Sequence, residues 1–109
     1  MLPTRKLLLQ RELKKNLGIL KRKYYPEKVI LFGSLSSGKV REWSDIDLLV
    51  IKDTNKRFYD RLKDVFKLLK PNVGMDLLVY TPKEYENMKG RLFFNSEILG
   101  KGKVLYERK

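Results

Sequence analysis

The 109-residue chain contains no cysteine and no histidine. Their absence excludes disulfide bonds, thiolate chemistry, imidazole acid–base catalysis and the usual zinc sites. Carboxylates and hydroxyls remain as the main reactive groups. No apolar run approaches the ~20 residues of a membrane span, and the N-terminus lacks the small-residue cleavage site of a secretory signal. We therefore expect a cytoplasmic protein without membrane contact.

Positive charge dominates what is present. The chain has 25 Lys and Arg residues against 13 Asp and Glu, a net charge of +12. This excess attracts nucleic acid, nucleotides or an acidic protein without distinguishing among them. Residues 1–28 hold nine basic and two acidic side chains. This segment is either a solvated helix face or a docking surface for an acidic partner or RNA.

Hydrophobic periodicity predicts a single domain over residues 1–109 of the α/β (α+β) class, with a mixed sheet of about four strands and helices packed on it. Thr4 is the expected cap of the first helix and Asn55 that of the second. The expected elements, in order, are helix 4–23, strand 29–32, a loop over 34–43, strand 46–52, helix 55–70, strand 73–81, short helices at 82–90 and 91–99, and an edge strand within 100–107.

Two aspartates stand at the start of a very apolar strand. Asp45 and Asp47 are separated by one residue, and the two-residue period of a strand directs both to the same face, with Cα atoms roughly 6.5 Å apart. Two carboxylates held at the edge of a core repel each other and favour a cation between them. Because the chain has no His or Cys, oxygen ligands for Mg²⁺ or Mn²⁺ are indicated.

A Gly-Ser pair lies upstream, directly after another predicted strand. Gly33 lets the backbone approach a ligand closely, and the Ser34 hydroxyl and the following amides can donate hydrogen bonds to phosphate oxygens. Lys39 and Arg41 in the same loop are either solvated charges or phosphate ligands. Ser44 is expected to cap or orient the turn before the aspartates, and with Lys39 and Arg41 it completes the candidate nucleotide-binding set.

The stretch FGSLSSGKVREWSDIDLLV resembles the signature of the DNA polymerase β-like nucleotidyltransferases. That signature is an apolar residue, Gly-Ser or Gly-Gly, about ten residues, and two acidic residues that alternate with apolar ones. The length and the order of elements are similar to the minimal nucleotidyltransferases, which are often paired with an all-helical HEPN protein as toxin and antitoxin. The resemblance implies the polymerase β-like fold and a HEPN-family partner.

The resemblance also implies roles for individual residues. Asp45, Asp47 and Asp76 would be catalytic and hold Mg²⁺ or Mn²⁺ against ATP, with Asp76 supplied by the third strand and helping to deprotonate the attacking hydroxyl. The implied reaction transfers AMP from ATP to a hydroxyl, here a tyrosine of the HEPN toxin, so that the chain acts as an antitoxin.

The chain departs from the family pattern in one respect. Many minimal members carry arginines in the Gly-Ser loop, where this chain has Leu35 and Ser37. An antitoxin that neutralises a HEPN partner by contact alone is therefore an alternative. Modification of a small molecule such as an aminoglycoside is another, although it usually needs an extra helical domain. A small basic RNA-binding protein is the third, supported by charge only.

Overall fold

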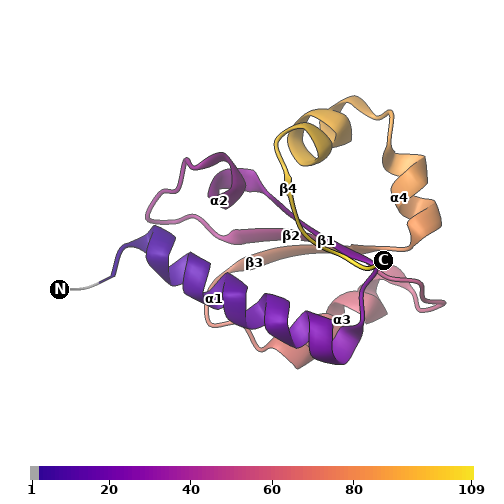
Figure 1. Cartoon of the computed structure of the whole chain (residues 1–109), viewed down its shortest axis with the longest axis horizontal. Helices are drawn as coiled ribbons and strands as arrows, with labels where there is room; N and C mark the ends of the chain where they lie inside the picture. Colours follow the sequence, from indigo (N-terminus) through magenta and orange to yellow (C-terminus); the bar gives the residue numbers. More distant parts are fainter. Residues whose placement is uncertain (1–2) are drawn as a thin grey trace.

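A computed structural model describes residues 3–109 and shows a four-stranded mixed sheet with helices on both faces (Figure 1). Residues 1 and 2, which begin the segment judged not to be a secretory signal, lie outside the described residues. The elements in chain order are α1 (Arg5–Ile19), the π-helical segment η1 (Leu20–Tyr24), β1 (Lys28–Phe32), α2 (Gly33–Ser37), β2 (Ile46–Ile51), α3 (Phe58–Leu69), β3 (Met75–Tyr80), α4 (Pro82–Met88), the π-helical segment η2 (Phe94–Gly100) and β4 (Lys103–Glu107).

The strand order is β3-β2-β1-β4. Strand β1 pairs antiparallel with β2 and with β4, whereas β2 pairs parallel with β3. The predicted mixed α+β sheet of four strands is confirmed. Strand β2 is central and almost wholly buried, as its apolar sequence requires.

Side-chain alternation along β2 divides the core between the two faces of the sheet. Leu48 and Val50 pack in the larger cluster with residues of α1 and α3, whereas Leu49 and Ile51 pack in the smaller one with residues of α4 and η2. Figure 1 shows α1 and α3 below the sheet and α4 above it. Among residues 3–109, no helix is both long and apolar enough to cross a bilayer.

The predicted helix caps had different outcomes. The Thr4 hydroxyl accepts a hydrogen bond from the backbone of Leu7 at 3.2 Å, so the cap of α1 is confirmed. The cap assigned to Asn55 is wrong, because α3 begins at Phe58 and Arg57 occupies the cap position without a side-chain bond. The reason is a turn upstream, in which Thr54 accepts a hydrogen bond from the backbone of Lys56 at 3.1 Å and delays the helix.

A buried arginine on α3 ties the two helical layers together. The Arg61 guanidinium donates to the Val79 carbonyl on β3 at 3.0 Å, to the Lys56 carbonyl at 2.8 Å and to the Glu84 carboxylate on α4 at 2.6 Å. Glu84 also closes the capping box of α4 with Thr81. Arg61 thus satisfies carbonyls near an edge strand while its charge is paired, a long-range role that helical periodicity does not reveal.

Replacing Arg61 by methionine keeps much of the aliphatic stem and removes all of these donors. We expect the free energy of unfolding in urea, followed by circular dichroism, to fall by about 1–3 kcal/mol because buried acceptors lose their partners. The matched control is Arg57→Met, an exposed position of the same segment, for which a change within about 0.5 kcal/mol is expected. Equal losses in the two variants would contradict the proposed role of Arg61.

Candidate active site

The end of β1 and the start of β2 meet at Gly33 and Asp47. Phe32 is the register partner of Asp47, so Gly33 lies beside the aspartate as the chain turns into α2. Gly33 has a φ of 73°, in the left-handed region that favours glycine, and a Cβ at this position would overlap the Asp47 carboxylate. The glycine therefore makes room for a carboxylate of this same chain.

Asp47 and Asp76 face each other across neighbouring strands. They are register partners in the parallel pair of β2 and β3, and their carboxyl groups are hydrogen-bonded. The pKa of Asp47 is raised from 3.8 to about 7, by burial first, then by the hydrogen bond to Asp76 and by the negative charges of Asp76 and Asp45. The metal-free site therefore favours the protonated form of Asp47 more strongly than an exposed aspartate would.

Contrary to the prediction from the sequence, the Asp45 side chain does not converge with that of Asp47 but points toward Gly74 and Arg5. Its carboxylate lies against Gly74, where a Cβ would overlap it, and one oxygen is 3.6 Å from a guanidinium nitrogen of Arg5 on α1. Arg5 is held there by a 2.9 Å hydrogen bond to the carbonyl of Ser44. The charge of Asp45 reaches Asp47 and raises its pKa, but its carboxylate is engaged by α1.

The three predicted acids do not form a complete metal site. Across residues 3–109, no three acidic side chains stand close enough together to hold a metal ion. The neighbouring carboxyl oxygens of Asp47 and Asp76 fit a hard cation, because their mutual repulsion, seen in the raised pKa of Asp47, would be relieved by positive charge. Asp45 would join them only by leaving Arg5.

A cavity of about 440 Å³ opens at Gly33, the residue that packs against Asp47. Three of the five predicted nucleotide-binding residues, Gly33, Ser34 and Lys39, line it. The rest of its lining is Ser37, Glu97 and Lys101. Hydroxyls and two lysine ammoniums in one hollow are suited to an anionic ligand such as a chain of phosphates.

The other two predicted loop ligands do not line this cavity. Ser44 is buried, and its hydroxyl accepts a hydrogen bond from the backbone of Arg41 at 2.8 Å. Ser44 therefore caps the turn before Asp45, which is one of the two roles predicted for it. Arg41 is exposed at that turn. Leu35, one of the two loop residues that depart from the expected family pattern, is buried in the core and does not line the cavity.

Sequence reasoning missed four residues at this end of the sheet: Arg5, Gly74, Glu97 and Lys101. Gly74 carried a weak signal, because it directly precedes the strand of Asp76. The other three are charged residues on helices or turns, and nothing in their local sequence separates them from solvated charges.

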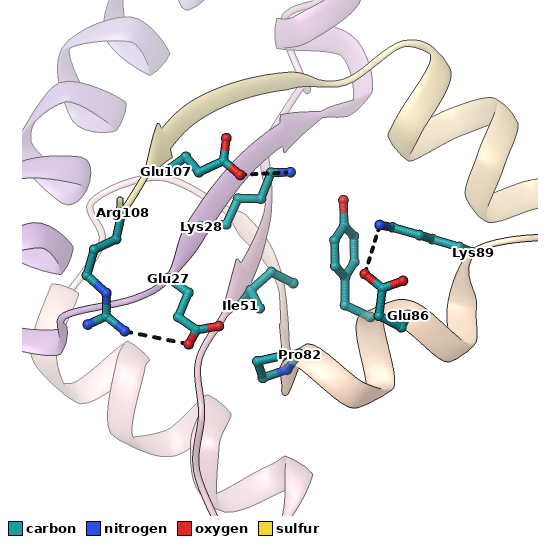
Figure 2. Close-up of a pocket in the computed structure, with 9 residues that line it drawn as sticks. Glu27, Lys28, Ile51, Pro82, Glu86, Lys89, Glu107 and Arg108 are labelled. Atoms are coloured by element: carbon teal, nitrogen blue, oxygen red, sulfur yellow. Dashed lines mark hydrogen bonds and ion pairs between the residues drawn. The ribbon is translucent and has the colours of Figure 1, made fainter.

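A second cavity, of about 360 Å³, lies at the opposite end of β1 (Figure 2). It is bordered by Lys28, the register partner of Ile51, whereas Asp47 pairs with the other end of β1. Its cations are already neutralised: Lys28 by Glu107 at 3.6 Å, Arg108 by Glu27 at 3.6 Å and Lys89 by Glu86 at 2.9 Å. This hollow offers no unpaired charge to a phosphate, so we place the chemistry at the Asp47 end.

The chain is similar to one protein family and to individual proteins within it. A model of the family described as polymerase beta, nucleotidyltransferase, matches residues 14–109. The chain is 35% identical over 101 residues to the putative protein adenylyltransferase MJ0604 of Methanocaldococcus jannaschii, a match that spans 89% of this chain and 97% of the relative. It is 33% identical over 76 residues to the putative protein adenylyltransferase MJ1379 of the same organism, spanning 69% and 76% of the two chains.

The fold is also found among solved structures. The crystal structure of a putative nucleotidyltransferase from Sulfolobus solfataricus matches with a TM-score of 0.66 over 94% of this chain and 84% of that chain, at 20% identity. That likeness shows a shared fold. The resemblance read from the Gly-Ser and Asp-Ile-Asp motifs is thereby confirmed, and the chain belongs to the polymerase β nucleotidyltransferase family.

Proposed function

We propose that the chain is a metal-dependent protein adenylyltransferase that transfers AMP from ATP to a hydroxyl group of another macromolecule. The observation that carries the proposal is the packing of Asp47 between Gly33 and Asp76, directly beside a cavity lined by Ser34 and Lys39. The naming of two relatives as putative protein adenylyltransferases supports a protein acceptor.

In this proposal each residue has a defined task. Ser34 and Lys39 bind phosphate oxygens of ATP, and Asp47 and Asp76, joined by Asp45, hold Mg²⁺ or Mn²⁺. The metal supplies positive charge that stabilises the entering and leaving oxygens. Asp76, exposed at the strand end, accepts the proton of the attacking hydroxyl. The acceptor oxygen forms a bond to the α-phosphorus, the bond from that phosphorus to the bridging oxygen breaks, and pyrophosphate leaves.

The proposed acceptor is a tyrosine of an all-helical HEPN partner, which the chain silences as an antitoxin. The motif resemblance suggests this pairing, and the geometry is compatible with it because Asp76 is exposed rather than enclosed. Neutralisation by contact alone is the competing account, motivated by Leu35 and Ser37. The experiments below distinguish the two.

The raised pKa of Asp47 predicts how the stability of the metal-free protein depends on pH. Because the folded-state pKa of Asp47 is raised from 3.8 to about 7, its neutral form stabilises the metal-free fold below about pH 4, and this contribution is lost as pH rises through 7. Asp47→Asn should therefore melt higher than wild type at pH 8, with the difference shrinking toward pH 4. Differential scanning calorimetry of the wild type and of Asp47→Asn measures the two melting temperatures at each pH.

Metal and ATP should reverse that ranking. Mn²⁺ or Mg²⁺ with ATP binds the folded wild type and raises its melting temperature by mass action, whereas Asp47→Asn should show little shift. Asp53→Asn is the matched control, since Asp53 is exposed in the loop after β2. A full metal–ATP shift in Asp47→Asn would show that the site is assigned incorrectly.

The transfer reaction is predicted to need Asp76. Incubated with ATP, Mg²⁺ and a HEPN-type partner, the wild type should add one or more AMP units to a partner tyrosine and release pyrophosphate. Asp76→Asn should still bind ATP but transfer at least ~100-fold more slowly, the range expected for loss of a general base. Intact-mass spectrometry of the partner measures the yield. A partner that stays unmodified yet is fully inhibited in a stoichiometric complex would favour contact neutralisation.

The exposed basic side chains of α1 are predicted to dock that partner. Arg11 and Lys14 are exposed, whereas Lys15 is engaged by the buried Glu12 at 3.0 Å and is left unchanged. Reversing Arg11 and Lys14 to glutamate should slow association and flatten its salt dependence, because exposed charges steer binding and are screened beyond about 8 Å. Lys63→Glu with Lys67→Glu, on the exposed side of α3, is the control. Loss of RNA affinity with unchanged partner affinity would favour the RNA-binding alternative.

A further inference from the structure

Lys101 reaches the phosphate cavity from the far end of the chain. It follows η2, and its carbonyl accepts a 2.8 Å hydrogen bond from the buried hydroxyl of Ser36 on α2. The next residue, Gly102, packs tightly against η2, because a Cβ at this position would overlap the carbonyl of Ile98. The backbone of Lys101 is thus attached to the Gly-Ser turn although 65 residues separate it from Ser36.

The Lys101 side chain has a weak partner in the same cavity. Its ammonium lies 3.2 Å from a carboxylate oxygen of Glu97, one helical turn earlier, and both side chains are largely exposed, at 60% and 41%. Exposed pairs of this spacing contribute little to stability. The ammonium is therefore free to exchange Glu97 for a more highly charged anion at small cost.

The cavity needs a second cation if it is to hold a polyphosphate. The helical turn Gly33–Ser37 of this chain contains no basic residue, and Leu35 within it is buried in the core. Lys39 borders the hollow from the loop that follows α2, and Lys101 borders it from the turn that follows η2. The hydroxyls of Ser34 and Ser37 belong to the same lining. The two lysines come from separate segments, so together they surround the hydroxyls.

We propose that Lys101 binds the β- and γ-phosphates of the nucleotide and that Glu97 holds its ammonium in place while the cavity is empty. This inference rests on the proposed function, because it assumes that the triphosphate enters the cavity beside Gly33. The α-phosphorus then lies toward Asp47, and the outer phosphates extend away from it into the hollow. Lys101 thus supplies a positive charge that the Gly33–Ser37 turn itself lacks.

The test compares ligands that differ in phosphate number. Isothermal titration with Mg²⁺ present should show that Lys101→Ala weakens ATP by about tenfold, as expected for one lost charge-assisted hydrogen bond, while AMP affinity stays within about twofold. Lys101→Arg should restore most of the ATP affinity, and Glu97→Gln should strengthen ATP binding, because the competing carboxylate is gone. Inorganic tripolyphosphate should follow ATP.

The control is Lys103→Ala, an exposed lysine on β4 that does not line the cavity, and it should leave all affinities unchanged. If wild type binds ATP and Lys101→Ala binds it equally well, the inference is overturned while the proposed function stands. An equal loss of AMP and ATP affinity would also overturn it, because the outer phosphates would then not be the contact. If wild type binds neither ATP nor tripolyphosphate, the proposed function itself fails.

Discussion

The Asp47 carboxylate lies where any other residue at position 33 would place its Cβ. This one steric constraint connects the two motifs that the sequence displays ten residues apart. Because Phe32 and Asp47 are register partners, a shift of the strand pairing by one residue would remove Asp47 from Gly33 and turn its side chain to the other face of the sheet. The register that buries Leu48 and Val50 therefore also builds the site.

The same packing makes the metal-free site electrostatically unfavourable. Asp47 is pressed against Asp76 and within reach of the charge of Asp45, and its pKa rises to about 7. The raised pKa of Asp47 favours its neutral form, and Arg5 lies beside Asp45. Both features reduce the net negative charge at this end of the sheet. A scaffold with a rigid, apolar β2 tolerates this strain because the core offsets it.

Local patterns predicted the parts of this protein that depend on neighbours in sequence. The buried strands, the first helix with its Thr4 cap, and the Gly-Ser and Asp-Ile-Asp motifs are all of this kind. What escaped prediction depends on contacts across the chain: Arg61 bonds to β3 and α4, and Arg5 turns Asp45 toward α1. A charged residue on a helix carries no local sign of such a partner. The Asn55 cap was wrong because a neighbouring Thr54 turn competed for the same backbone.

The distribution of charge pairing explains how a strongly basic chain presents a selective site. At the Lys28 end of β1, the cavity of Figure 2 is lined by three basic side chains, and each is paired with its own carboxylate. At the Gly33 end, the cavity holds Lys39, for which the described residues provide no ion pair, and Lys101 in a weak exposed one. A polyanion would compete with three carboxylates at the first end, whereas at the second it would compete with Glu97 alone. The position of a few acidic residues, rather than the net charge of +12, therefore makes the end of the sheet with Asp47 and Asp76 the more favourable one for an anionic ligand.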